Sequence, residues 1–145
     1  MGRLRVAVVG VGHHGVFHCE KYLKIPEVEL TAVVDARRER AREVARRFRS
    51  QGFDDHRRIL GMVDAVSVVV PTVDHFGVAK DFLKRGVHVL LEKPMTATLR
   101  EADGLIRLAK KSGALLQVGH LERFNPAVLA IRDKITTPGF IESMR

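Results

Sequence analysis

The chain contains 145 residues, 46% of them hydrophobic, and carries a formal net charge of +8 at pH 7 with a sequence pI of about 10.2. This length suits one domain, and the apolar content is sufficient for an ordinary core. No apolar run approaches the length of a membrane-spanning helix and no signal-like region precedes the first strand, so we expect a cytoplasmic protein with no membrane partner.

An apolar run near the amino terminus leads into a glycine-rich turn. Residues 5–9 are predicted to form a strand, and Gly10, Gly12 and Gly15 follow it in the pattern Gly-x-Gly-x-x-Gly. In a strand-turn-helix unit these glycines allow, in order, a positive φ, the close approach of a pyrophosphate, and tight packing of the helix on the strand. The phosphates would meet the free N–H groups at the start of that helix.

The helix after this turn is expected to end before Pro26. Its apolar stripe would contain Val16, Phe17, Cys19, Tyr22 and Leu23. A second strand is predicted over residues 30–34 and ends at Asp35, twenty residues after Gly15. Dinucleotide-binding folds place at this position an acid that accepts hydrogen bonds from the adenosine ribose. This context favours a nucleotide site over a structural glycine turn.

Much of the positive charge lies in residues 37–49. The apolar residues of this segment follow the spacing of an amphipathic helix and are Ala41, Val44, Ala45 and Phe48. The arginines would then form a solvated outer face. A nucleic-acid surface is the less favoured alternative, because no aromatic residues are interleaved for base stacking.

Strand and helix patterns alternate through the rest of the chain. Strands are predicted over residues 65–70, 87–91 and 114–118, and a short turn or helix over residues 55–60. Helices are predicted from Asp74 to Gly86, from Thr98 to Gly113, and from Asn125-Pro126 to about Ile135. Thr98 and Glu101 form a capping box at the start of the second of these helices. Its apolar stripe would contain Leu99, Ala102, Leu105, Ile106 and Ala109.

Apolar strands separated by amphipathic helices predict an α/β fold: a doubly wound parallel sheet of the Rossmann type. Ligands on such sheets bind beyond the carboxyl ends of the strands. Five loops are therefore expected to share one edge, namely Gly10–Gly15, Asp35, Pro71-Thr72, Glu92-Lys93-Pro94 and Gly119–Arg123.

These motifs resemble those of the glucose-fructose oxidoreductase, inositol dehydrogenase and rhizopine catabolism (Gfo/Idh/MocA) family. The matching segments are Gly-x-Gly-x-x-Gly-x-x-His ending at His18, Asp35, Pro71-Thr72-x-x-His75, Glu92-Lys93-Pro94, and Gly119 with Arg123-Phe124-Asn125-Pro126. Thr72 replaces the usual asparagine of the family. The loop over residues 119–127 resembles the branch that oxidises the 3-hydroxyl of UDP-N-acetylglucosamine.

The resemblance implies an NAD(P)-dependent dehydrogenase of a sugar, polyol or nucleotide sugar, and a homo-oligomer at full length. It also implies that residues 1–138 are the dinucleotide-binding domain and that residues 139–145 begin a substrate domain that is truncated here. Without that domain the chain is expected to bind cofactor but to turn over little substrate. A non-catalytic NAD-binding module, which senses redox state or supports a partner, is the alternative.

Lys93 is the candidate catalytic residue. An alcohol that gives hydride to nicotinamide also loses its hydroxyl proton, and a nearby lysine can help to remove that proton or stabilise the alkoxide. The resemblance implies that Lys93 lies beside the nicotinamide and that Glu92 positions it. The alternative is a surface lysine that pairs with Glu92.

The sequence favours NAD but leaves NADP open. Asp35 would repel a 2′-phosphate, whereas Arg37 or Arg38 could bind one. His13 and His14 are expected to cover the cofactor; without a carboxylate or cysteine at ligand spacing they predict no metal site.

Family position adds four cofactor-side candidates, which are Pro71, Thr72, His75 and Arg123. His75 could instead be a histidine at the start of a helix whose ring is satisfied by backbone, and Arg123 a surface ion-pair partner.

Overall fold

A six-stranded sheet lies at the centre of the structure, a computed structural model that describes residues 2–132. Its strands are β1 (Leu4–Val9), β2 (Val28–Val34), β3 (Gln51–Phe53), β4 (Ala65–Val68), β5 (His88–Leu91) and β6 (Leu116–Val118). They pair in the order β3-β2-β1-β4-β5-β6, and every pair is parallel. This order is that of the doubly wound dinucleotide-binding fold, in which the chain changes direction between β1 and β4. The predicted fold class is confirmed.

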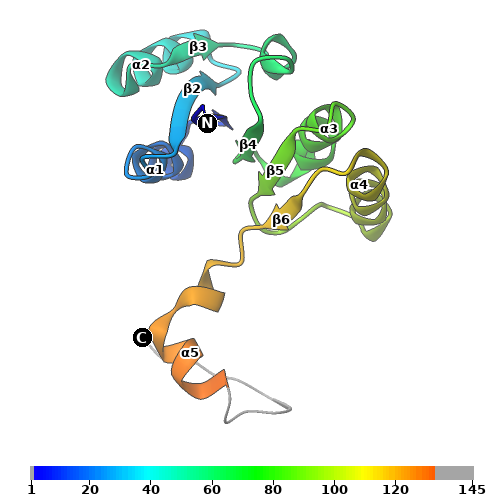
Figure 1. The fold of residues 1–145 in the computed structure, drawn as a ribbon. Helices are drawn as coiled ribbons and strands as arrows, with labels where there is room; N and C mark the ends of the chain where they lie inside the picture. The colour runs from blue at the N-terminus through cyan, green and yellow to red at the C-terminus, as the bar shows by residue number, and fades with distance from the viewer. Residues whose placement is uncertain (1, 133–145) are drawn as a thin grey trace.

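Helices cover both faces of the sheet. Their bounds are α1 (His13–Tyr22), α2 (Arg38–Phe48), α3 (Thr72–Leu83), α4 (Leu99–Ser112) and α5 (Pro126–Arg132), with short 3₁₀ helices η1 (His56–Ile59) and η2 (Leu121–Phe124). In Figure 1, α1 and α2 lie on one side of the sheet, and α3 and α4 lie on the other. η2 and α5 stand apart from these layers (Figure 1).

The core consists of two apolar layers, one on each side of the sheet. In β1, Val6 and Val8 pack with α1 and α2, whereas Ala7 and Val9 pack with α3 and α4. Successive strand side chains point to opposite faces, so a strand that is covered twice must be apolar throughout. Cys19 of α1 is buried in the first layer, where burial raises the pKa of its thiol to about 12. The thiol therefore stays protonated and unreactive near neutral pH.

One strand of the sheet is missing from the sequence prediction. β3 has three residues with Gly52 at its centre, so it shows neither an apolar run nor alternation. Pairing with β2 and packing against α2 define it instead: a Cβ on Gly52 would lie 2.8 Å from the carbonyl oxygen of Ala41. β6 begins at Leu116, two residues after the predicted start.

The helix stripes are partly as predicted. All four stripe residues of α2 are buried. The prediction is wrong for Phe17 and Leu23 near α1 and for Leu99 and Ile106 in α4, which are exposed. Leu23 and Leu99 occupy helix ends, and Phe17 and Ile106 lie at the margins of their stripes. The stripe residues that are buried in these two helices are Val16, Cys19, Leu105 and Ala109.

The predicted helix caps are present. The Thr98 hydroxyl accepts from the Glu101 N–H at 3.3 Å, and the Glu101 carboxylate accepts from the Thr98 N–H at 3.1 Å. Asn125 caps α5 by accepting from Ala127 N–H at 2.9 Å. The expected extension of this helix to Ile135, the boundary at residues 138–139 and the substrate-domain start at 139–145 lie outside the described residues.

An ion pair fastens β1 to the start of β4 at the amino ends of the strands. Asp64 accepts from the Arg5 main-chain N–H at 2.9 Å and pairs with the Arg5 guanidinium at 2.7 Å. Hydrogen bonding from the Arg5 side chain is the main cause that lowers the pKa of the Asp64 carboxyl. A carboxyl whose pKa is lowered by folding stabilises the fold above its unfolded pKa of about 3.9, and this contribution is lost as the pH falls through the native pKa.

Asp64→Asn is therefore expected to lower the free energy of unfolding at pH 7, by no more than about 1 kcal/mol because the pair is exposed. Urea unfolding of both proteins between pH 7 and pH 3 checks this: the difference should shrink towards the acid end. Asp103→Asn is the matched control, since this exposed acid forms no hydrogen bond or ion pair with residues 2–132, and it should leave stability unchanged. A difference that is independent of pH would contradict the assignment.

Candidate functional site

The loops after β1 and β4 meet where the strand order reverses. Gly10, directly after β1, has a φ of 88°, so the expected positive φ is confirmed. Its N–H donates to the carbonyl of Val34 at 2.8 Å. A Cβ at Gly10 would lie 2.5 Å from the carbonyl oxygen of Val69, so the close approach of the two loops also requires glycine.

The other two glycines of the turn differ in their surroundings. A Cβ at Gly15 would collide with the carbonyl oxygen of Gly10 and lie 3.5 Å from the side chain of Val8, so α1 packs directly on β1 as predicted. A Cβ at Gly12 would meet nothing within 4 Å. Gly12 is the N-cap of α1 and has no side chain, so it leaves the first N–H groups of α1 without a side-chain cap.

A cavity of about 1020 Å³ opens at this reversal point, beyond the carboxyl ends of β1, β2 and β4. Five of the predicted site residues line it: Gly10, Gly12, Asp35, Arg37 and Pro71. The remainder of its wall comes from the ends of β1 and β2, the loops after β2 and β4, residues 54–57, and α3 as far as Asp81. Its volume is at the upper end of the range for small-molecule sites. Of the five loops that were predicted to share one edge, those at Gly10–Gly15, Asp35 and Pro71-Thr72 thus meet at this cavity.

Asp35 presents one partnered and one open carboxylate oxygen to this cavity. Its side chain is 11% exposed, and Oδ1 accepts from the main-chain N–H of Arg37 at 3.1 Å and from its Nε at 3.2 Å. Oδ2 has no hydrogen-bond partner among residues 2–132. The open oxygen can accept a ribose hydroxyl, while the Arg37 guanidinium partly balances the charge.

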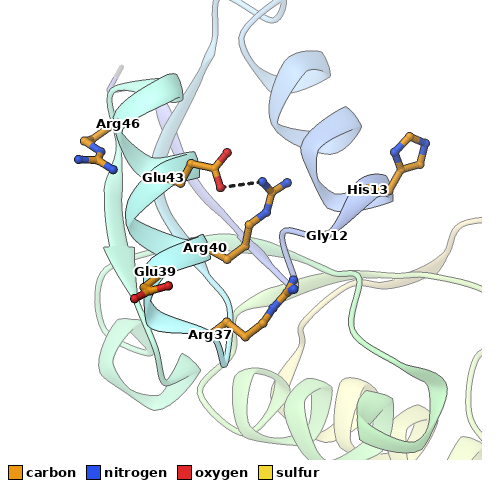
Figure 2. Close-up of a pocket in the computed structure, with 7 residues that line it drawn as sticks. All are labelled: Gly12, His13, Arg37, Glu39, Arg40, Glu43 and Arg46. Carbon is orange, nitrogen blue, oxygen red and sulfur yellow. Dashed lines mark hydrogen bonds and ion pairs between the residues drawn. The ribbon is translucent and has the colours of Figure 1, made fainter.

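A second cavity of about 620 Å³ adjoins the first and shares Gly12 and Arg37 with it. Figure 2 shows Arg37 and Arg40 of the α2 region reaching towards the glycine turn, whereas His13 points away from them. Arg40 Nε donates to the carbonyl of Val11 at 2.9 Å, and Nη1 pairs with Glu43 at 3.0 Å (Figure 2). The space between the turn and α2 is therefore lined by guanidinium groups that are partly neutralised.

Glu92 and Lys93 follow β5 on the same edge of the sheet. The Glu92 N–H donates to the carbonyl of Val68 at 3.0 Å, which aligns the ends of β5 and β4. Glu92 Oε1 lies 3.1 Å from Nε2 of His18, and Oε2 accepts from the Lys93 main-chain N–H at 3.2 Å. The Lys93 side chain is exposed and forms no ion pair within the described chain, so the expected alternative, a pair with Glu92, is not seen. The Lys93–Pro94 peptide bond is cis.

His75 has a different surrounding from that of a cofactor ligand. It is 1% exposed, and its Nδ1 and Nε2 lie 2.9 Å from the carbonyl oxygens of Pro94 and Val70, respectively. The ring thus joins the loop after β4 to the loop after β5. Both nitrogens face main-chain carbonyl oxygens, of which a ring with one N–H donates to one, and this favours the alternative role of His75. Cofactor contact by His75 stays a prediction.

Three further candidates lie away from the large cavity. Thr72 is the first residue of α3, and its neighbours Pro71 and Val73 line the cavity in its place. His14 is exposed on α1. Arg123 is exposed on η2, which stands clear of the sheet (Figure 1). Cofactor binding by these residues stays a prediction.

Ser67 is a site residue that the sequence analysis does not identify. It is fully buried in β4, where its hydroxyl bonds Tyr22 at 2.6 Å and Nδ1 of His18 at 3.1 Å. A signal was available, because Ser67 is the one polar residue of the apolar run 65–70. A buried hydroxyl requires a partner, so it predicts polar side chains on the helix that covers it.

No group of three or more His, Cys, Asp or Glu side chains within residues 2–132 is placed to hold a metal ion. Across the same range, no helix has the length and apolar character needed to cross a membrane.

Comparison with known proteins agrees with this geometry. The family model of the oxidoreductase family with an NAD-binding Rossmann fold (GFO_IDH_MocA) matches residues 4–120. UDP-N-acetylglucosamine 3-dehydrogenase of Acidithiobacillus ferrooxidans is 42% identical over 146 residues, which cover 100% of this chain and 46% of that protein. The chain therefore spans less than half the length of this relative.

Solved structures show the same arrangement. The A. ferrooxidans dehydrogenase, GnnA, superposes with a TM-score of 0.86 at 43% identity, over 94% of this chain and 44% of that one. GenD2 from gentamicin A biosynthesis, in complex with NAD, gives 0.89 at 29% identity over 94% and 40% of the two chains. KijD10, a 3-ketoreductase from Actinomadura kijaniata in complex with NADP, gives a TM-score of 0.85 at 28% identity over 92% and 44% of the two chains. The chain belongs to the Gfo/Idh/MocA oxidoreductase family, of which it forms an NAD-binding Rossmann domain.

Proposed function

We propose that this chain is the cofactor domain of a longer dehydrogenase that transfers hydride between NAD(P) and a secondary alcohol of a sugar or nucleotide sugar. The observation that carries the proposal is the cavity at the β1/β4 reversal, bounded by Gly12 and Asp35, with Lys93 on the same edge of the sheet. A dinucleotide laid across this edge would place its adenosine end at Asp35 and its nicotinamide end towards β5.

Each residue would have a separate role. The open space beside Gly12 and the uncapped start of α1 suit a pyrophosphate, because free N–H groups and the helix dipole favour an anion there. Asp35 Oδ2 would accept a ribose hydroxyl. The nicotinamide, when bound, supplies the hydride acceptor. Lys93 would take the hydroxyl proton as a neutral amine, or stabilise the alkoxide as an ammonium, and its side chain forms no ion pair with residues 2–132 that would hold it elsewhere.

NAD is the proposed cofactor, with NADP as the weaker ligand. The Asp35 carboxylate would repel a 2′-phosphate on the adjoining ribose. Arg37 and Arg40 offset this repulsion, but both already have acidic partners, Asp35 and Glu43. A 2′-phosphate would have to displace these ion pairs.

UDP-N-acetylglucosamine, oxidised at its 3-hydroxyl, is the proposed substrate. The support is the 42% identity to a dehydrogenase of that name, together with the loop over residues 119–127. The part of the relative that this chain does not cover would correspond to the substrate domain. Homo-oligomeric assembly and a cytoplasmic location of the full-length protein stay predictions.

The 145-residue chain is expected to bind NAD in a calorimetric titration, more tightly than NADP, and to leave UDP-N-acetylglucosamine unoxidised. The full-length protein should reduce NAD with this sugar, followed by the absorbance of NADH, because turnover needs substrate and cofactor held together. Absence of NAD binding would overturn the cofactor site. Brisk sugar oxidation by the 145 residues would overturn the division into domains, and NAD binding without turnover of any sugar at full length would favour the non-catalytic module.

A further inference from the structure

Four polar side chains form a continuous path from the interior to the loop that carries Lys93. The Tyr22 hydroxyl lies 2.6 Å from Ser67 Oγ, which lies 3.1 Å from His18 Nδ1. His18 Nε2 is 3.1 Å from Glu92 Oε1, and Glu92 Oε2 accepts the Lys93 N–H at 3.2 Å. None of Tyr22, Ser67, His18 and Glu92 lines the cavity at the reversal point, so they do not form the wall of the cofactor site described above.

The hydrogen bonds of this path can all run in one direction. Burial raises the pKa of the Tyr22 hydroxyl, which therefore keeps its proton and can donate to Ser67. Ser67 can then donate to Nδ1 of the His18 tautomer that carries its hydrogen on Nε2, and this Nε2–H donates to Glu92. In this arrangement each of the four side chains has a hydrogen-bond partner. The His18 Nε2–H is then held in place and points at Oε1 of Glu92.

Three segments converge on the Glu92 carboxylate. His18 comes from the middle of α1, Lys93 follows Glu92 in the chain, and a Cβ on Gly119, after β6, would lie only 3.1 Å from Oε1. The carboxylate is 15% exposed and has little room to turn. Its position therefore fixes the main chain at the point where the Lys93 side chain leaves it.

A role in packing alone does not account for these residues. Ser67 sits between Val66 and Val68 in a strand that is otherwise apolar, and an apolar residue there would fill the same layer. Buried polar groups lower stability unless all are bonded, and here the bonds end at the loop of the candidate catalytic lysine.

We propose that His18 is a positioning residue for Lys93 and acts through Glu92. The Tyr22–Ser67 pair holds the His18 ring, His18 holds the carboxylate, and the carboxylate holds the Lys93 main chain. This inference rests on the proposed function of Lys93.

The test compares His18→Leu and His18→Gln in the full-length dehydrogenase. His18→Leu is expected to lower kcat by about tenfold, with KM for the sugar and Kd for NAD nearly unchanged, because a displaced catalytic group slows only the chemical step. His18→Gln should restore most of kcat, since its amide can donate to Glu92. Val44→Ala, a core change in the same apolar layer, should lower Tm and leave kcat unchanged.

Lys93→Met in the same assay separates the two possible failures. Full activity of Lys93→Met would overturn the catalytic role proposed for Lys93. If Lys93→Met is inactive but His18→Leu has a normal kcat, only the positioning role of His18 is overturned. The positioning role would also be overturned if His18→Leu changed only KM or NAD affinity, or if a folded His18→Gln had the low kcat of His18→Leu. If His18→Leu fails to fold, kcat of His18→Gln decides: a value near that of the unchanged protein supports the role, and a low value overturns it.

Discussion

Lys93→Met is expected to lower kcat of the full-length dehydrogenase by about 10²–10⁴-fold, the usual contribution of a positioned proton-transfer group. Methionine has nearly the length of lysine but no ammonium group. The Lys93 side chain is exposed and makes no ion pair with residues 2–132, so its loss should change stability by less than about 0.5 kcal/mol. Affinity for NAD should stay close to that of the unchanged protein.

Steady-state kinetics with NAD and UDP-N-acetylglucosamine checks this result, with calorimetry for the cofactor. Lys111→Met is the matched control: this lysine is exposed near the end of α4, and its loss should not change kcat. Lys93→Arg distinguishes two roles, because a guanidinium stabilises an alkoxide but does not accept a proton. Low activity of Lys93→Arg would identify Lys93 as the proton acceptor. Normal kcat in Lys93→Met would contradict the assignment.

The sequence alone was sufficient for the architecture because the architecture depends on local patterns. Strands buried on both faces must be apolar runs, and the stripe of α2 is marked by arginines on either side. The glycine turn was also predictable, since Gly10 and Gly15 answer backbone requirements and Gly12 was expected from the approach of a pyrophosphate. β3 was not, because three residues around Gly52 become a strand only through pairing with β2.

The site divides in the same way. The part of the site proposed for adenosine follows from strand ends, so Gly10, Asp35 and Pro71 could be placed together in advance. The partners of His18 could not, because they are 49 and 74 residues away along the chain. His75 was predicted on the cofactor side, but its ring is buried between the carbonyl oxygens of the loops after β4 and β5. Pairings between distant residues leave no periodicity, and only a buried hydroxyl such as that of Ser67 signals them.

Gly12→Ala is expected to separate cofactor binding from folding. A Cβ at Gly12 meets nothing within 4 Å, and the φ of −67° is open to any residue, so the fold should persist with an unchanged Tm. The added methyl would enter the space assigned to the pyrophosphate. Overpacking costs about 2 kcal/mol, which corresponds to roughly a 30-fold loss of NAD affinity.

Gly61→Ala is the matched control for Gly12→Ala, because a Cβ there also meets nothing within 4 Å and Gly61 lines neither cavity. It should leave both Tm and NAD affinity unchanged. Gly15→Ala is expected to fail differently, by losing stability, since its Cβ would collide with the carbonyl oxygen of Gly10. Calorimetric titration with NAD and thermal unfolding distinguish the three variants. A folded Gly12→Ala that binds NAD normally would show that the pyrophosphate does not lie over the start of α1, and the glycine turn would then serve only to pack α1 against β1.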